Sequence, residues 1–166
     1  DGKSIVLTQK ASASDFVLPA DISSQYISGM LMAMPESDKN VILRMEGKIT
    51  SKPYIDLTID VLKNFGINVK SFSNSFFIGK NEKYITPQKL TAGGDWSNSS
   101  YFLGMGALVG RGITVCGLDM RSIQGDKRIT DILSAFGAKV AVRGSSVSVT
   151  RGELKPVRIN ADGIPD

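Results

Sequence analysis

The sequence predicts a repeated α/β (α+β) fold, in which two copies of one helix-and-strand unit follow each other along the chain. Residues 60–69 align with residues 131–140, and the Asp, Leu, Phe, Gly and Val of the two segments coincide. Upstream, Asp21-Ile22-Ser23 matches Asp95-Trp96-Ser97, and an apolar stretch rich in small residues follows each of them. A repeat of roughly 70 residues is longer than most solenoid repeats, so it indicates a duplicated α/β unit.

Each copy is expected to open with a helix that its Asp-x-Ser segment starts, because Asp and Ser favour the residue just before a helix. These helices are predicted at about 23–34 and 97–109, where Ser, Gly and Ala allow close packing. Apolar and β-branched runs then predict strands at 41–46 and 112–116.

A second amphipathic helix is predicted in each copy, at about 54–65 and 126–136, because apolar residues recur there every three or four positions. Gly66 and Gly137 follow these helices, where a glycine in the left-handed conformation commonly ends a helix. Two short strands then close each copy as a hairpin: 67–72 with 75–79, and 138–142 with 146–150. A strand such as residues 4–8 is expected before the first copy. The unit is therefore β-α-β-α-β-β, with a small mixed sheet.

Residues 86–94 form the predicted linker between the copies, since Pro87 lies near its start and Gly93-Gly94 at its end. We place the boundary near residue 91, which gives a domain of residues 1–91 and a domain of residues 92–166. The first residue is Asp1 rather than Met, and we expect these residues to be a piece of a longer protein.

The amino-acid composition excludes several kinds of site. The 166 residues include no histidine, which excludes Ser-His-Asp and Cys-His catalysis and any histidine-ligated metal site. The single cysteine, Cys116, leaves neither an internal disulfide nor a cysteine-rich zinc site, and within its apolar strand it is expected to be buried. The stretches without charge are shorter than the roughly 20 apolar residues that span a bilayer. We therefore expect a cytoplasmic protein with no membrane partner.

The net charge of +4 favours anionic partners, although the basic residues form no run. The sequence lacks the aromatic residues interleaved with Lys and Arg on one strand face that RNA-binding sheets use, so we expect no nucleic-acid partner. A non-catalytic basic α/β module that binds anions or nucleic acid stays the alternative to an enzyme.

Two helix starts in the first copy carry hydroxyl groups. Ser23-Ser24-Gln25 opens the first helix, whose free N–H groups and positive dipole end suit a phosphate, although Ser23 acting only as a cap is the simpler interpretation. Ser51 is likewise either a cap or a ligand contact, and Tyr54 lies in the first turn of the next helix. The matching segment of the second copy, Gln124-Gly125-Asp126, has neither Ser nor Tyr. This asymmetry favours a ligand site on the first copy.

Five segments, in this order and at this spacing, resemble the 5-enolpyruvylshikimate-3-phosphate synthase family: residues 21–26, 51–56, 94–95 with 99–103, 124–126 and 164–166. The resemblance runs from about residue 16 to residue 166, and its most specific part is Ser-Ser-Gln together with Ser-Lys-Pro-Tyr-Ile-Asp. It implies two lobes, each with three β-α-β-α-β-β units around a pseudo-threefold axis. Residues 1–91 would supply one unit of the lobe that holds shikimate 3-phosphate. Residues 92–166 would supply one unit of the other lobe, ending at the catalytic aspartate.

The resemblance also implies roles for individual residues. The phosphate of shikimate 3-phosphate would be bound by three hydroxyl groups, those of Ser23, Ser24 and Ser51. Gln25 would lie between that substrate and phosphoenolpyruvate, and Tyr54 would line the shikimate pocket. Asp166 would contact the shikimate hydroxyls and accept a proton. From the residues alone, a carboxylate after a Pro turn is either a general base or an ordinary loop residue.

The implied activity is transfer of the enolpyruvyl group from phosphoenolpyruvate to the 5-hydroxyl of shikimate 3-phosphate, with release of phosphate and with no metal or organic cofactor. The implied partners are these two substrates and the remainder of the enzyme chain, and the whole enzyme is expected to be a monomer. Residues 1–166 alone are expected to be inactive, because the phosphoenolpyruvate-binding segments of the family are missing.

Two related enzyme classes share the implied fold. UDP-N-acetylglucosamine carboxyvinyltransferase stays the alternative transferase, although Ser-Ser-Gln and Ser-Lys-Pro-Tyr resemble the shikimate branch. RNA 3′-phosphate cyclase works through a nucleophilic histidine, and this sequence has no histidine.

Overall fold

The computed structural model describes residues 13–21, 23–49, 51–161 and 164, and it divides the chain into two compact units. The first unit takes residues 1–49 and 58–86, and the second takes residues 50–57 and 87–166. The boundary that we predicted near residue 91 thus lies inside the second unit as the structure divides the chain. Assignment of the units to two lobes of a larger enzyme stays a prediction.

The first unit is built on a four-stranded mixed sheet. Its strands are β1 (Asp15–Pro19), β2 (Val41–Glu46), β3 (Lys70–Phe72) and β4 (Ser75–Ile78), in the order β1-β2-β4-β3. β1 runs parallel to β2, and the other two pairs are antiparallel. The predicted strand at residues 4–8 lies outside the described residues. β1 itself was not predicted, because five residues ending in proline give a weak strand pattern.

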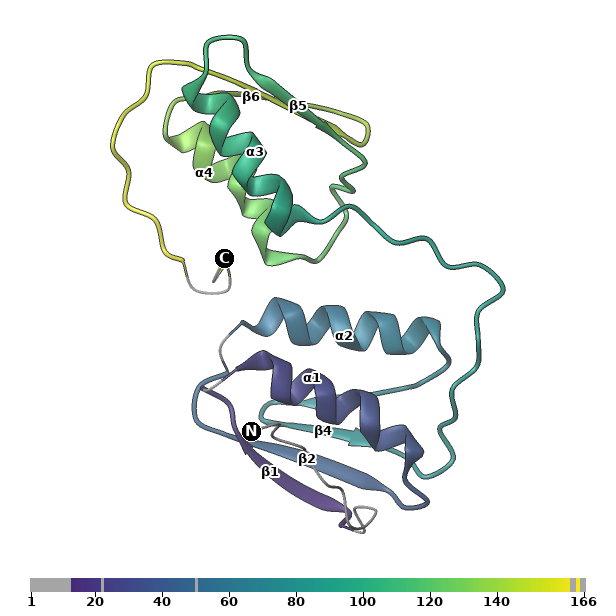
Figure 1. The fold of residues 1–166 in the computed structure, drawn as a ribbon. Coiled ribbons are helices and arrows are strands. Elements are labelled where there is room, and N and C mark those ends of the chain that lie inside the picture. Colours follow the sequence, from purple (N-terminus) through teal and green to yellow (C-terminus); the bar gives the residue numbers. More distant parts are fainter. Residues whose placement is uncertain (1–12, 22, 50, 162–163, 165–166) are drawn as a thin grey trace, which may run out of the picture. The chain divides into compact units, whose positions relative to one another are not determined.

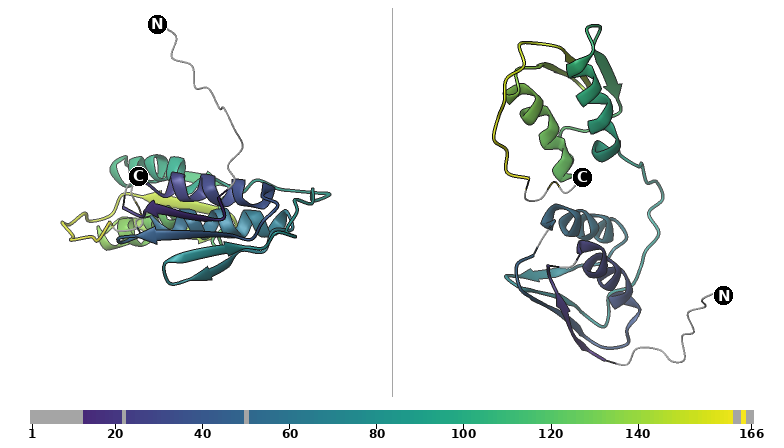
Figure 2. Two further views of the ribbon diagram at one scale, coloured as in Figure 1. Left: turned by 90° about the horizontal axis from the view of Figure 1, so that it is seen from below. Right: turned by 60° about the vertical axis from the view of Figure 1, so that its left-hand side comes forward.

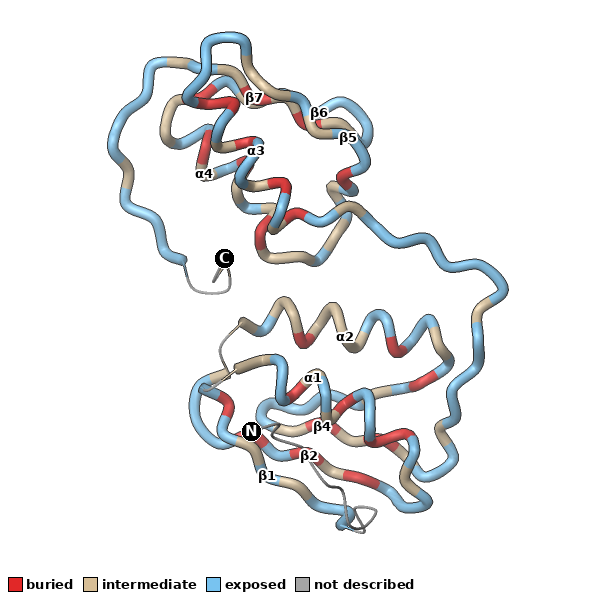
Figure 3. Tube along the Cα trace, viewed as in Figure 1, coloured by how far each residue is buried: buried red, intermediate tan, exposed pale blue. Residues whose placement is uncertain are grey.

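Two helices cover one face of this sheet (Figures 1 and 2). They are α1 (Ser24–Ala33), which a 3-10 turn extends, and the part of α2 (Lys52–Asn64) that belongs to this unit. The hydroxyl groups of Ser28 on α1 and Thr58 on α2 are 2.8 Å apart and form a hydrogen bond. Alternate residues of β2 are buried, as are the α1 residues that face the sheet (Figure 3).

The second unit has a three-stranded sheet of β5 (Ile113–Cys116), β6 (Lys139–Arg143) and β7 (Ser146–Thr150), in the order β5-β7-β6. Both pairings are antiparallel, so our prediction of a mixed sheet is wrong for this copy. The reason is that residues 79–95 form no strand that could pair with β5. Cys116 is exposed rather than buried, because burial alternates along β5 and the cysteine lies on the outer face with Thr114.

Helices α3 (Trp96–Leu108) and α4 (Ile129–Ala135) pack on this sheet, and a 3-10 turn, Gly125–Arg128, precedes α4. The helix predicted at 126–136 is therefore a 3-10 turn followed by a shorter α-helix. A single core joins the layers, with Trp96, Leu103, Leu133, Val147 and Val149 buried. The indole N–H of Trp96 is satisfied by the carbonyl of Asp119, 3.2 Å away.

The two copies of the sequence repeat also share a pattern of hydrogen bonds at the end of their second helix. Gly66 and Gly137 end α2 and α4 with φ angles of 82° and 94°, in the left-handed region, as predicted. The residue after each glycine donates its N–H across the helix end, from Ile67 to Leu62 and from Ala138 to Leu133, 3.0 Å in both. This is the Schellman arrangement that satisfies the last carbonyl groups of a helix.

We predict opposite effects for two substitutions on α3. A Cβ added at Gly106 would lie 2.7 Å from the carbonyl oxygen of Val149, whereas a Cβ at Gly104 would meet nothing within 4 Å. Gly106→Ala should lower the free energy of unfolding by about 1–3 kcal/mol through forced separation of α3 and β7. Gly104→Ala should raise it by up to about 1 kcal/mol, because alanine favours a helix. Urea unfolding measures both, and equal effects would contradict the packing described here.

Candidate functional site

The start of α1 presents neutral hydrogen-bonding groups. Ser23 is the N-cap, with extended backbone, and its hydroxyl accepts a hydrogen bond of 3.2 Å from the N–H of Gln25. The first turn of α1 contains no acidic residue. Among the described residues, the Ser24 hydroxyl and the Gln25 side-chain amide have no hydrogen-bond partner. Capping therefore accounts for Ser23 and does not involve the side chains of Ser24 and Gln25.

The serine that precedes α2 has a strained backbone conformation. Ser51 has a φ of 53°, and it is the one non-glycine residue with positive φ in the part of the chain that the structure describes. Its carbonyl accepts from the N–H of Tyr54 at 3.1 Å, but its hydroxyl has no partner among the described residues. The left-handed conformation costs roughly 1–2 kcal/mol at a non-glycine residue, and such strain concentrates at functional sites. The structure thus gives no support to Ser51 as a simple cap.

The start of α3 differs from that of α1 in charge. Asp95 caps α3 and its carboxylate accepts from the N–H of Asn98 at 3.2 Å. The repeat aligns Ser97 with the cap Ser23, but the structure does not make Ser97 a cap, because α3 begins at Trp96 and its cap is Asp95, two residues before Ser97. A carboxylate at a helix N-terminus already uses the positive end of the helix dipole. Of these two starts, only that of α1 leaves this positive end to an anionic ligand.

Tyr54, in the first turn of α2, makes a contact that the sequence did not reveal. Its phenolic O–H donates to Oδ2 of Asp126 at 2.6 Å, and Asp126 is only 6% exposed. Both residues belong to the second unit. The sequence does not predict this contact, because no periodic pattern links two residues that are 72 positions apart in the chain.

The structure therefore places the predicted residues that it describes in two groups. Ser23, Ser24 and Gln25 lie together in the first unit, whereas Ser51 and Tyr54 lie together in the second. Asp166 lies outside the described residues. A phosphate site shared by Ser23, Ser24 and Ser51 stays a prediction.

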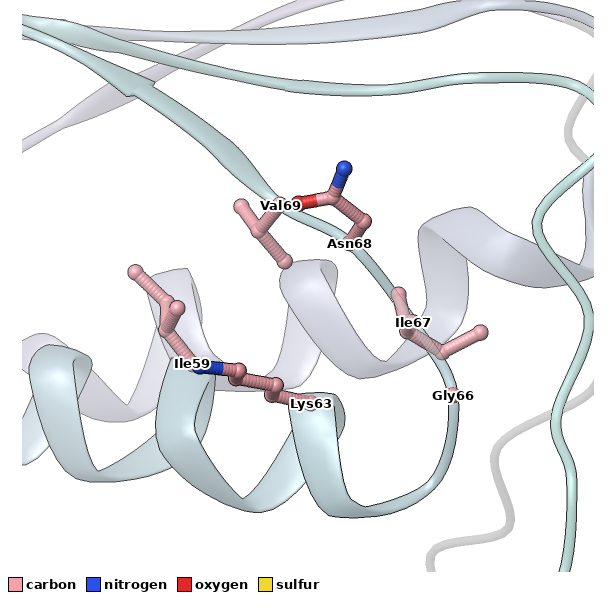
Figure 4. A pocket seen from close by; sticks show the side chains of 6 residues that line it. All are labelled: Ile59, Lys63, Gly66, Ile67, Asn68 and Val69. Carbon is pink, nitrogen blue, oxygen red and sulfur yellow. The ribbon is translucent and has the colours of Figure 1, made fainter.

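Two cavities of the first unit lie away from these residues. One, of 230 Å³, is bounded by Ile59 and Lys63 of α2 and by residues 66–69, which lead toward β3 (Figure 4). The other, of 270 Å³, is lined mainly by apolar side chains, including Phe16, Met30 and Met34. Neither is lined by a predicted site residue, so these cavities do not mark the candidate site.

The perturbed titratable groups also lie outside the candidate site. The hydrogen bond from Arg121 lowers the pKa of Asp119, and burial together with Glu36 raises the pKa of Tyr84. The described residues bring together no cluster of three acidic or cysteine side chains suited to a metal ion. Within the same residues, no helix combines the length and the apolarity that crossing a bilayer requires.

Comparisons with known proteins agree with one another. The family model described as EPSP synthase (3-phosphoshikimate 1-carboxyvinyltransferase) matches residues 5–166. Proteins of Salmonella arizonae and Salmonella typhimurium named 3-phosphoshikimate 1-carboxyvinyltransferase are each 35% identical over 156 residues. These alignments cover 93% of this chain and 36% of each relative, so the chain spans little more than a third of their length.

Solved structures show the same fold at lower identity. An EPSP synthase from Acinetobacter baumannii superposes with a TM-score of 0.63 and 20% identity, over 91% of this chain and 34% of that one. The enolpyruvyl transferase NikO from Streptomyces tendae superposes with a TM-score of 0.55 and 15% identity, over 82% and 35%. The predicted enolpyruvyl transferase fold is thereby confirmed.

We predict that the two adjacent serines of α1 differ in their effect on stability. Ser23→Ala should lower the free energy of unfolding by about 1 kcal/mol, because it removes the cap of α1. Ser24→Ala should change it by less than about 0.5 kcal/mol, since its hydroxyl bonds no described residue. Urea unfolding of both variants tests this, and an equal loss for the two would assign Ser24 to the helix rather than to a ligand.

Two substitutions of Ser51 should show separately how its backbone strain and its hydroxyl group affect the stability of the fold. Ser51→Gly should raise the free energy of unfolding by about 1 kcal/mol, because glycine adopts a positive φ without the Cβ penalty. Ser51→Ala is the matched control: it removes the same hydroxyl, keeps the Cβ, and should leave the stability nearly unchanged. Thermal unfolding measures both, and a loss of stability in both variants would show that the hydroxyl supports the fold.

Proposed function

This chain belongs to the EPSP synthase (3-phosphoshikimate 1-carboxyvinyltransferase) family, and we propose that it supplies the shikimate 3-phosphate site of a longer enzyme. That enzyme transfers the enolpyruvyl group from phosphoenolpyruvate to the 5-hydroxyl of shikimate 3-phosphate and releases phosphate. Residues 1–91 contribute the substrate-binding unit, and residues 92–166 contribute a unit of the other lobe that ends at the catalytic aspartate.

The observation that carries this proposal is the difference between the starts of α1 and α3. The start of α1 offers the hydroxyl groups of Ser23 and Ser24 at the positive end of the helix dipole, and no acidic residue lies in its first turn. The carboxylate of Asp95 occupies the equivalent place on α3. Backbone N–H groups and a helix dipole favour an anion where no carboxylate competes for them. A phosphate ester therefore suits the first copy and not the second.

The remaining residues fit the chemistry of the transfer. The 5-hydroxyl adds to C2 of phosphoenolpyruvate while C3 takes up a proton, and the tetrahedral intermediate then loses phosphate together with a proton from C3. The hydroxyl is a weak acid, so a positioned base accelerates its addition by roughly 10²–10⁴-fold, and we assign that role to Asp166. Ser51 completes the phosphate contacts, and Gln25 lies between the two substrates.

The proposal extends to the setting of the enzyme. The cationic groups that neutralise phosphoenolpyruvate come from the remainder of the enzyme chain, since stabilising its developing charge needs preorganised donors and cations. The enzyme works as a cytoplasmic monomer, without a cofactor and without a nucleic-acid or membrane partner.

The direct test is release of phosphate from the two substrates by the full-length protein and by residues 1–166 side by side. We expect turnover by the full-length protein and none by the 166-residue chain, because the missing cations are worth several kcal/mol and each 1.36 kcal/mol is a factor of ten in rate. Turnover by the short chain would contradict the assignment of phosphoenolpyruvate binding to other segments. A full-length protein without turnover would contradict the proposed function.

Two variants of the full-length protein connect this activity to its residues. Asp166→Asn should lower kcat by roughly 10²-fold or more with little change in KM. Ser51→Ala should weaken binding of shikimate 3-phosphate by roughly 1–3 kcal/mol, the scale of a hydrogen bond to a charged group. An unchanged kcat in the first variant, or an unchanged affinity in the second, would remove that residue from its role.

A further inference from the structure

Asp126 is a buried carboxylate to which the proposed reaction gives no part. It lies in the 3-10 turn Gly125–Arg128 and is 6% exposed. Within the described residues it forms no ion pair, and the neighbouring Lys127 ammonium bonds the carbonyl groups of Met120 and Ser122. An acidic side chain is rarely buried unless a partner compensates for the lost water. The phenolic O–H of Tyr54, at 2.6 Å, is such a partner.

The segment around Asp126 is fixed by its own hydrogen bonds. The side chain of Gln124 accepts from the N–H of Trp96 at 2.9 Å and donates to the carbonyl of Gly94 at 3.0 Å. The two Lys127 bonds, both 2.8 Å, tie the turn to residues 120–122. The Asp126 carboxylate is therefore a fixed acceptor, and it can hold the side chain that donates to it in one orientation.

The direction of this bond limits what Tyr54 can offer a ligand. A phenol has a single proton, and Tyr54 donates it to Asp126, so it cannot donate the same proton to a phosphate oxygen. The negative charge of Asp126 beside the phenolic oxygen would also repel a phosphate placed there. Tyr54 consequently suits the uncharged part of a ligand, which its ring can contact.

We infer that Asp126 is a positioning residue, which holds Tyr54 so that the tyrosine contacts the carbocycle of shikimate 3-phosphate rather than its phosphate. This inference rests on the proposed function, and it deepens that function by naming the residue that orients Tyr54. Of this hydrogen-bonded pair, only Tyr54 contacts the ring. Asp126 itself does not touch the substrate.

The test is steady-state kinetics of the full-length protein with Tyr54→Phe, Asp126→Ala, Asp126→Asn and the double variant Tyr54→Phe/Asp126→Ala. Tyr54→Phe and Asp126→Ala should each raise KM for shikimate 3-phosphate by roughly tenfold, with a smaller change in kcat and no change in KM for phosphoenolpyruvate. The double variant should be no worse than the more damaging single one, because both remove the same bond. Asp126→Asn should recover most of the affinity, since its amide oxygen can still accept from Tyr54.

A second ligand, which has the ring but no phosphate, distinguishes contacts to the ring from contacts to the phosphate. Unphosphorylated shikimate, used as a competitive inhibitor, should lose affinity in Tyr54→Phe and Asp126→Ala by the same factor as shikimate 3-phosphate. Ser24→Ala should weaken shikimate 3-phosphate and leave shikimate unaffected. If the pair affects the phosphorylated ligand alone, the assignment of Tyr54 to the ring is overturned.

Two control variants and one stability measurement complete the test. Tyr84→Phe removes another phenolic hydrogen bond, to the carbonyl of Met32, and should leave KM unchanged. Asp131→Asn removes an exposed carboxylate of α4, with the same expected result.

A purely structural role for Asp126 would lower the melting temperature and kcat with KM unchanged, and it would overturn the inference. A wild-type protein without turnover would overturn the proposed function and this inference together, whereas normal turnover with unchanged KM in all four variants would overturn only this inference.

Discussion

Each copy of the repeat depends on the glycine that ends its second helix. Gly66 and Gly137 adopt a backbone conformation that other residues reach only at a cost, and the chain can then reverse toward the hairpin strands. The same turn receives a later segment: Ile85 donates its N–H to the carbonyl of Phe65, and Lys155 donates to that of Phe136, both at 2.8 Å. At Gly137 an added Cβ would lie 2.0 Å from the Glu153 carbonyl oxygen, so the returning segment also requires the glycine. Helix end, hairpin and returning segment are thus set by one position in each copy.

The function that we propose arises where the copies differ. Their architecture requires a capped helix start, and either a hydroxyl or a carboxylate can cap one. Ser23 on α1 and Asp95 on α3 satisfy that requirement equally well. The choice of cap nevertheless decides whether the helix end attracts or repels an anion. The strained backbone of Ser51 is a second difference, because the architecture has no evident need for a non-glycine residue there.

The elements that could be predicted from the sequence are those set by local patterns. The helix ends at Gly66 and Gly137 and the strand β2 were predicted because glycine placement and apolar runs act over a few residues. β1 was missed, since its short sequence owes its strand conformation to pairing with β2 rather than to its own pattern. The bond between Tyr54 and Asp126 could not be predicted for a related reason: it depends on tertiary packing, which leaves no periodic trace in the sequence.

The most direct measurement of the central claim is a crystal structure of the full-length protein with bound shikimate 3-phosphate. The account predicts that the phosphate oxygens lie within hydrogen-bond distance, about 2.5–3.0 Å, of the Ser23, Ser24 and Ser51 hydroxyl groups. It also predicts that the Tyr54 ring contacts the carbocycle while its O–H stays on Asp126. A phosphate bound elsewhere, with the hydroxyl groups of Ser24 and Ser51 directed into solvent, would contradict the account.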